Sequence, residues 1–443
     1  MSGADPAGAT GRAGNPVAAY ATVTLGYWAF MLTDGALRML VLLHFHKLGF
    51  SPIQLAYLFL GYELMGVLTN LCAGWLAARF GLTRTLYAGL LLQIGALLAL
   101  AALDPSWGVW ASVAFVMAVQ SASGVAKDLT KMSAKSAVKI LAPDSQEGAL
   151  FRWVALLTGS KNAVKGIGFL LGAALLALAG FEAAVLGMAA ALSVLFIATA
   201  LLMPAGLPRG KPKVPFSRVF STDPNVNWLS AARVFLFAAR DVWFVVGIPI
   251  YFYGVLSDGS TEGNRAAFFM IGAFMAVWIL FYGAVQAAAP RIVRAKDPVT
   301  GDVAPLAAIV EQARWWVGLL TLIPAGLAGV AMVPAWESAM PVVVVLALLA
   351  FGYVFAVNSS VHSYLILAFS RGERVTLDVG FYYMSNSAGR LLGTLLSGLS
   401  FQFGGLALCL GTAAAMAALS WVFAGRMVQQ FDPGPAQAEG PRV

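Results

Sequence analysis

Charged residues are scarce in this chain. Only 11% of its 443 residues are Asp, Glu, Lys or Arg, whereas 60% are hydrophobic and the mean hydropathy is +0.81. In a typical soluble domain about a quarter of the residues are charged. The composition therefore excludes a soluble globular domain and indicates a membrane protein.

Cysteine and histidine are also rare. Cys72 and Cys409 each fall within a hydrophobic run, where we interpret them as small apolar core residues. The three histidines are too scattered for a metal site of standard spacing. No nucleophile with an adjacent base is recognisable either. We therefore expect no metal, no cofactor and no enzymatic activity.

Long hydrophobic runs dominate what is present. A helix needs about 20 apolar residues to cross about 30 Å of hydrocarbon, and twelve runs reach that length. The sequence thus predicts an all-α membrane protein with twelve transmembrane helices. The predicted spans are 18–43, 53–78, 85–103, 107–126, 150–180, 183–203, 226–256, 266–289, 313–333, 341–369, 375–402 and 405–425.

Basic residues lie mainly on alternate loops. If both termini are cytoplasmic, nearly all loop lysines and arginines are inside, and only Lys47 and Arg265 are outside. The net charge of +8 is therefore explained by membrane topology, and no nucleic-acid partner is expected.

A segment rich in Pro, Gly and basic residues separates the first six runs from the last six. We predict an N-terminal six-helix half at 18–203, a cytoplasmic linker at 204–225 and a C-terminal six-helix half at 226–426. A disordered tail at 1–17 and a C-terminal tail at 427–443 complete the predicted organisation.

Short segments of the two halves match each other. Asp34 precedes "HFH" by the same spacing with which Asp241 precedes "YFY". In addition, "SKNAVKGIG" at 160–168 matches "SNSAGRLLG" at 385–393, which pairs Lys165 with Arg390. Internal repeats of this kind are typical of transporters.

The twelve runs, the central basic linker and the loop "GWLAARFGLTR" resemble the major facilitator superfamily. Gly74, Arg79, Gly81 and Arg84 match the loop signature of that family, whereas Ala78 stands where the family usually has aspartate. The resemblance implies a fold of two six-helix halves and transport by alternating access. The alanine puts the usual gating role of this loop in doubt, but not the fold.

Charges within the runs are the strongest functional signal. A charged side chain near the bilayer centre costs roughly 2.5 to 3.5 kcal/mol on insertion scales, so such residues usually pair or line a substrate path. The basic ones outnumber the acidic ones, which predicts a multiply charged anion as the missing partner. The basic residues are Arg38, Lys161, Lys165, Arg233, Arg240 and Arg390, and the acids are Asp34, Glu63 and Asp241.

Helical spacing groups the candidate substrate-binding residues. Lys161 and Lys165 share one face, and Tyr382, Asn386 and Arg390 follow one another in steps of four. The full candidate set is Arg38, Lys127, Lys131, Lys161, Lys165, Arg240, Asn358, His362, Tyr382, Asn386 and Arg390.

Structural alternatives exist for these residues. Lys161 and Lys165 could extend toward the cytoplasm, and the lysines at 127–139 could be a solvated anchor. Asn358 and His362, one turn apart, could simply form hydrogen bonds between helices.

The acids are candidates for coupling or gating. Asp34 and Arg38 lie one turn apart, so we predict that Asp34 holds Arg38 until Arg38 and Arg240 clamp the substrate. A purely structural Asp34–Arg38 pair is the alternative. Glu63 is either a proton carrier or a partner for Arg38, and Asp241 is the third acid of this group.

Three motifs of the N-terminal half resemble the ArsJ family of organoarsenical efflux permeases. They are "YWAFMLTDGALRMLVLLHFHKLGFSP", "GVAKDLTKMSAKSAVK" and "LFRWVALLTGSKNAVKG". The resemblance implies export of 1-arseno-3-phosphoglycerate from the bacterial cytoplasm through the inner membrane, and thereby arsenate resistance. It also implies a functional pairing with the glyceraldehyde-3-phosphate dehydrogenase that makes this ester. We expect a monomer. A sugar-phosphate/inorganic-phosphate exchanger and a non-transporting anion receptor are the alternatives.

Overall fold

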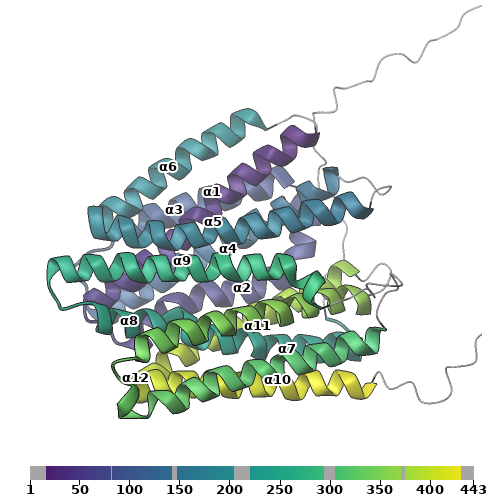
Figure 1. Cartoon of the computed structure of the whole chain (residues 1–443). Helices are drawn as coiled ribbons and strands as arrows, with labels where there is room; N and C mark the ends of the chain where they lie inside the picture. The colour runs from purple at the N-terminus through teal and green to yellow at the C-terminus, as the bar shows by residue number, and fades with distance from the viewer. Residues whose placement is uncertain are drawn as a thin grey trace, which may run out of the picture.

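The computed structural model describes residues 16–80, 82–141, 147–203, 220–293, 305–370 and 375–430. These residues form long helices joined by short connections (Figure 1). The first half contains α1 (Pro16–Lys47), α2 (Pro52–Phe80), α3 (Leu82–Ala101), α4 (Val109–Leu141), α5 (Glu147–Ala179) and α6 (Phe181–Leu202). The second contains α7 (Pro224–Val242), η2 (Trp243–Gly247), α8 (Ile248–Leu256), α9 (Thr261–Ile292), α10 (Leu306–Ala331), η3 (Pro334–Trp336), α11 (Met340–Phe369) and α12 (Val375–Gln430).

Local sequence explains where several helices begin. Asp223 caps α7 by accepting hydrogen bonds from Asn225 N and Val226 N, and proline occupies the first helical position. Ser260 caps α9 in the same way by accepting from Gly263 N at 2.9 Å. At η2 the α7 helix widens for one π turn, and the Ser397 hydroxyl accepts from two backbone amides of that turn. Two amides of this break are therefore paired within the apolar interior.

Eleven helices of the described chain are long and apolar enough to cross a membrane, and the last of them makes two crossings. α12 has 56 residues and is interrupted by non-helical backbone at Gly404 and Gly405. Gly405 has a φ of 56°, in the left-handed region that glycine adopts most readily. The break falls between the two spans that the sequence predicts there.

The segments of α12 before and after the break are called its first and second arms. Their contacts with α7 and η2 show that the two arms run in opposite directions. Along the first arm, Asn386 bonds Arg233, and Ser397 bonds the backbone farther along, at Val246. Along the second arm, Cys409 bonds the Val242 carbonyl and Ser420 bonds the Ala232 carbonyl, so the order is reversed. α12 is therefore a hairpin, and the predicted all-α fold with twelve crossings is confirmed.

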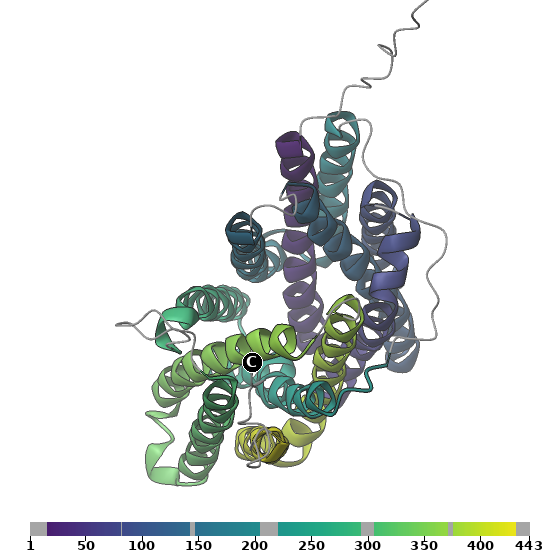
Figure 2. The same cartoon turned by 90° about the vertical axis from the view of Figure 1, so that its right-hand side faces the viewer.

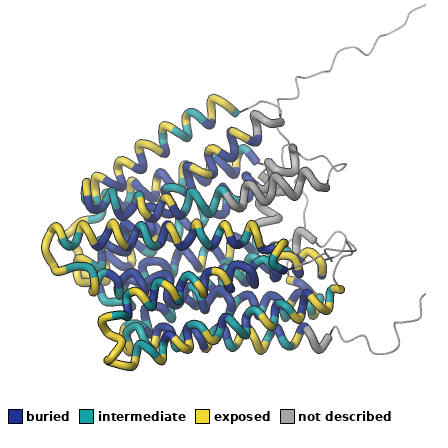
Figure 3. Tube along the Cα trace, in the orientation of Figure 1, coloured by how far each residue is buried: buried dark blue, intermediate teal, exposed yellow. Residues whose placement is uncertain are grey.

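The two halves lie side by side. Figure 1 shows α1, α3, α5 and α6 above α7, α10, α11 and α12, and Figure 2 shows the same two groups from the end of the bundle. They meet where α2 packs on α12 and where α5 packs on α9. Figure 3 shows exposed residues along the outer helices. Large apolar side chains such as Leu178, Val194 and Leu201 are exposed, as expected for a lipid-facing surface.

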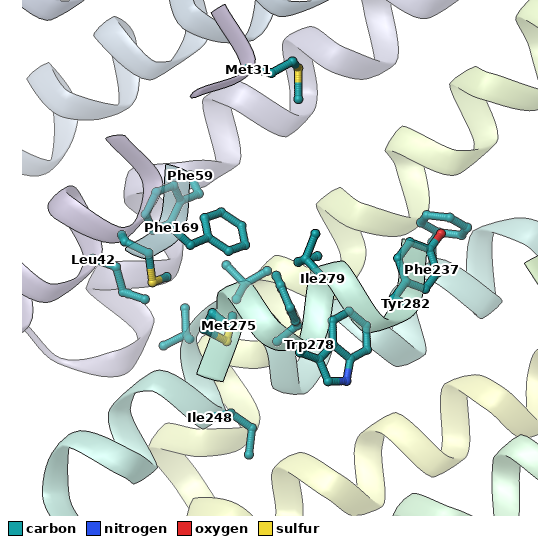
Figure 4. Packing of buried hydrophobic residues seen from close by; sticks show 14 of the residues in the cluster. Met31, Leu42, Phe59, Phe169, Phe237, Ile248, Met275, Trp278, Ile279 and Tyr282 are labelled. Atoms are coloured by element: carbon teal, nitrogen blue, oxygen red, sulfur yellow. The ribbon is translucent and has the colours of Figure 1, made fainter. Parts of the chain in front are cut away.

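Aromatic packing fills the core between the halves. Figure 4 shows Phe169 of α5, Trp278 of α9 and Phe237 of α7 within one cluster of buried residues. The Trp278 indole donates to the Leu348 carbonyl at 2.8 Å, so its single polar group is satisfied. The ring centroids of Phe169 and of Phe244 in η2 lie 6.0 Å apart, and this contact links the two halves.

One sequence expectation changes in the structure, and others cannot be compared with it. α4 continues to Leu141, so Lys127 and Lys131 lie on a helix and not on the loop that the sequence predicts after residue 126. The side chains of the loop signature at 74–81, the linker at 204–219 and both chain ends lie outside the described residues.

The matched segments of α5 and α12 occupy equivalent places. Glycines let α5 approach α1 closely: a Cβ atom on Gly168 would lie 2.5 Å from the Leu32 carbonyl oxygen. The matching Gly393 of α12 approaches α7 in the same way, with the Ala238 carbonyl oxygen at 2.8 Å from its Cβ position. The internal repeat in the sequence therefore corresponds to a repeated helix pair.

The closest approach of α5 to α1 predicts a stability defect. A methyl group at Gly172 would overlap the Ala36 carbonyl, so Gly172→Ala should lower the free energy of unfolding by roughly 1–3 kcal/mol. Gly187→Ala on α6 is the control, because nothing lies within 4 Å of its Cβ position. Thermal unfolding of both variants in detergent measures the difference, and equal melting temperatures would contradict the packing described here.

Candidate functional site

Three arginines and two carboxylates form one network that joins the two halves. Glu63 of α2 accepts hydrogen bonds on the same oxygen, Oε1, from Arg38 Nη2 of α1 and from Arg390 Nη2 of α12, each at 2.6 Å. Arg390 Nε also lies 3.5 Å from Asp241 Oδ2. Arg240 completes the group through a contact of 2.6 Å between its Nη2 and Asp241 Oδ1. These five residues are called the arginine network below.

Aromatic faces hold the outer arginines of this network. The Arg38 guanidinium lies 5.2 Å from the Phe59 ring centroid, and that of Arg240 lies 4.8 Å from the Phe237 centroid. Such cation–π contacts fix the orientation of a guanidinium without neutralising it. Arg38 and Arg240 therefore keep hydrogen-bonding capacity beyond their carboxylate partners.

Asp34 has partners other than the predicted one. Its Oδ2 accepts a hydrogen bond from Lys165 Nζ of α5 at 2.5 Å, and its Oδ1 accepts one from the Tyr62 hydroxyl of α2. The prediction that Asp34 holds Arg38 is wrong, because neighbouring helices bring closer donors to Asp34 than the next turn of α1. The structure instead shows Glu63 as the partner of Arg38. An extension of Lys165 toward the cytoplasm is wrong as well, and Lys161 is half-buried.

The two halves contain equivalent ion pairs. Asp34 with Lys165 joins α1 to α5, and Asp241 with Arg390 joins α7 to the first arm of α12. These are the residues that the internal repeat matches to each other. Glu63, Arg38 and Arg240 belong to the arginine network but are not part of this repeated pattern.

A second basic cluster surrounds Asp128 of α4, which is fully buried. Lys131 Nζ lies 3.0 Å from Asp128 Oδ1 and donates to Asn70 Oδ1 at 2.5 Å. Lys127 Nζ lies 4.0 Å from Asp128 and 4.2 Å from the Tyr62 ring centroid. Because Lys127 is only 8% exposed, a solvated anchor is the wrong interpretation for it. Asp128 was not among the predicted charges within spans because the predicted fourth span ends at residue 126, whereas α4 continues to Leu141.

Arg233 of α7 is buried among neutral partners. Its Nε donates to Asn386 Oδ1 at 3.3 Å and its Nη1 to the Ser359 carbonyl at 3.1 Å, and its guanidinium lies 4.9 Å from the Tyr382 ring centroid. No carboxylate of the described residues forms an ion pair with Arg233. From the sequence, Arg233 is predicted as a charge within a span but is not among the candidate substrate-binding residues.

Asn358 and His362 lie on α11, on either side of Ser359, whose carbonyl accepts the hydrogen bond from Arg233. Both are completely buried, and none of their side-chain nitrogen and oxygen atoms has a hydrogen-bond partner. The interpretation of these two residues as hydrogen-bond contacts between helices is therefore wrong.

The site as a whole has a surplus of positive charge. Among the residues described above, seven basic side chains stand against four carboxylates, which leaves three positive charges within this set. The basic residues are Arg38, Lys127, Lys131, Lys165, Arg233, Arg240 and Arg390, and the acids are Asp34, Glu63, Asp128 and Asp241. Such an arrangement can bind an anion that reaches both halves of the molecule.

Comparison with known proteins gives a family and a set of similar folds. The sequence model of the Major Facilitator Superfamily matches residues 23–376. No curated protein gives a significant match. Among solved structures, a POT family transporter in complex with 5-aminolevulinic acid is similar at 12% identity and a TM-score of 0.68, with 92% of this chain and 96% of that chain covered.

Two further solved structures have the same architecture. A POT family transporter with a thioalcohol-conjugated peptide gives a TM-score of 0.69 at 12% identity, with 92% of this chain and 96% of that one covered. A bacterial homologue of the iron transporter ferroportin in an inward-facing state gives 0.66 at 14% identity, with 93% and 99% covered. At these identities the similarity shows the fold alone.

The partner of Asp34 can be tested by rescue. Asp34→Asn leaves Lys165 as a buried charge without its carboxylate, and breaking a buried pair costs about 3–5 kcal/mol. Adding Lys165→Met should recover part of that loss, because the uncompensated charge is then gone. Adding Arg38→Met should instead lower the melting temperature further, because Arg38 pairs with Glu63. Rescue by Arg38→Met and not by Lys165→Met would refute the Asp34–Lys165 assignment.

Proposed function

The chain belongs to the major facilitator superfamily of membrane transporters, which are not enzymes, and we propose that this secondary transporter carries a multiply charged organic oxyanion by alternating access. The observation that carries this proposal is the arginine network, in which three arginines from both halves share two carboxylates. A structural role alone would be met by equal numbers of opposite charges, because unpaired charges in a membrane interior are costly.

Guanidinium groups suit such a substrate. An arginine can donate two parallel hydrogen bonds to a tetrahedral oxyanion, and its charge persists in a dry site. Arg38 comes from the N-terminal half, whereas Arg240 and Arg390 come from the C-terminal half. An oxyanion between them would contact both halves at once, so its binding would depend on their relative position. A ligand of this kind shifts the balance between conformations by its difference in affinity for them.

Glu63 is the internal competitor in this mechanism. Its Oε1 occupies the place between Arg38 and Arg390 in which a substrate oxygen would lie, and its Oε2 makes no hydrogen bond. Substrate binding would transfer the two arginines from the Glu63 carboxylate to the ligand. Asp34 and Asp241 would also act as gating residues, because each holds a basic side chain. Asp34 holds Lys165 of α5, and Asp241 holds Arg240 of α7.

The specific substrate we propose is 1-arseno-3-phosphoglycerate, exported from the bacterial cytoplasm to give arsenate resistance. The support is the resemblance of the N-terminal motifs to the ArsJ family, and these motifs contain Arg38, Lys127, Lys131 and Lys165 of the basic set. The ester has an oxyanion at each end, which suits the surplus of three positive charges. A dehydrogenase that forms the ester would be the functional partner.

Transport and resistance assays test the substrate. In proteoliposomes, counterflow should be supported by phosphorylated three-carbon acids and lost in Arg390→Ala. In cells, the protein should protect against arsenate only when the ester-forming dehydrogenase is present, because free arsenate is not the proposed ligand. Protection against arsenite without that dehydrogenase would contradict the proposal. Import of a sugar phosphate against inorganic phosphate would identify the exchanger instead.

The competitor role of Glu63 gives a separate prediction. Glu63→Gln removes the internal anion while it keeps the shape of the side chain, so the two arginines become available to the ligand. Anion affinity should rise by roughly tenfold, which corresponds to ~1.4 kcal/mol. The matched control is Glu182→Gln at the exposed start of α6, which should leave affinity unchanged. Titration of the purified variants measures both, and an unchanged or weaker affinity in Glu63→Gln would exclude competition.

A further inference from the structure

The surroundings of Arg233 contain buried polar groups that no described residue satisfies. Asn358 and His362 are 0% exposed, and Arg233 is 4% exposed. The amide of Asn358 and both ring nitrogens of His362 make no hydrogen bond. An unsatisfied buried polar group lowers the stability of the folded protein. Two such residues one helical turn apart, beside an arginine that pairs with no carboxylate of the described residues, indicate a site built for a ligand.

Resting on the function proposed above, we propose that Arg233, Asn358 and His362 form a second oxyanion subsite, which binds one end of a two-ended substrate whose other end lies at the arginine network. Arg233 supplies the charge, and the Asn358 amide and a His362 ring N–H supply neutral donors. The three residues come from α7 and α11, and the first arm of α12 supports them through Asn386.

The spacing between the two subsites suits a short chain. Arg233 and Arg240 both contact the Phe237 ring, and their guanidinium carbons lie 4.2 and 4.8 Å from its centroid. Because the two carbons cannot be farther apart than the sum of these distances, they are at most 9.0 Å apart. α12 also connects the second subsite to the arginine network. Asn386 contacts Arg233, and Arg390, one turn further along, contacts Asp241. An anion with a charged group at each end of three carbons can thus reach both arginines.

The arrangement also predicts which substrates are rejected. An anion with one charged end satisfies the arginine network and leaves Asn358 and His362 unpaired. An anion with two charged ends pairs them, so the second end contributes binding free energy that the first cannot. Selectivity for two-ended anions would then come from groups that the free protein leaves unsatisfied.

The test compares two probes of matched length, 1,3-propanediol bisphosphate and propyl phosphate, by titration of the purified full-length protein. Arg233→Gln and Asn358→Leu should weaken binding of the bisphosphate by roughly 10- to 150-fold, the range expected for lost charge-assisted hydrogen bonds. Binding of propyl phosphate should change less than about twofold, since its site is intact. The control Arg38→Gln should weaken both probes.

Each outcome is decisive. Asn358→Leu should also raise the melting temperature, because it replaces an unpaired buried amide by an apolar group of similar size. If both probes bind the folded variants as they bind the unaltered protein, the second subsite is excluded and the proposed function stands. If neither probe binds the unaltered protein, the anion-transport function fails and the subsite fails with it.

Discussion

The contact on which the rest of the site depends is the Glu63 carboxylate shared by Arg38 and Arg390. It is the point at which a charge from α1 and a charge from α12 meet on one oxygen atom, and it connects two halves that also meet through apolar packing and through neutral hydrogen bonds such as Asn70 to Ser387 and Asn162 to Gln286. In an apolar interior an ion pair is strong only while its geometry holds, because each charge left alone is expensive. The relative position of the halves and the occupancy of this contact are therefore coupled.

Much of the fold follows from the sequence because a bilayer leaves a chain few choices. Backbone groups in hydrocarbon must bond within the segment, so an apolar run of sufficient length has to be a helix. Even the hairpin at Gly404 and Gly405 was predictable, because hydropathy divides that region into two lengths that each fit one crossing. The repeat was also visible, since Lys165 and Arg390 sit in matching segments and in the structure form equivalent pairs.

The pairing of charges was less predictable, and the reason is tertiary. Spacing within one helix suggested that Asp34 bonds Arg38, but α5 brings Lys165 to Asp34 and α2 brings Glu63 to Arg38. Helical periodicity gives the face on which a residue lies and says nothing about which helix packs there. For the same reason, the sequence does not show that the His362 ring nitrogens lack hydrogen-bond partners among the described residues. Whether a histidine in an apolar run is hydrogen-bonded depends on the helix that packs against it.

Comparison of the two halves separates the charges that both halves share from those that one half has alone. A pair that occurs in both halves, such as Asp34 with Lys165 and its counterpart Asp241 with Arg390, holds two helices together in each half, and the proposed gating acts on that shared contact. Arg38 and Arg240 have no such counterpart, since the register of the repeated aspartates places Val245 and Thr33 opposite them. Charges that one half has and the other lacks cannot be required by the shared architecture. They are the residues at which the two halves have diverged, and they are the ones that a substrate between the halves would contact.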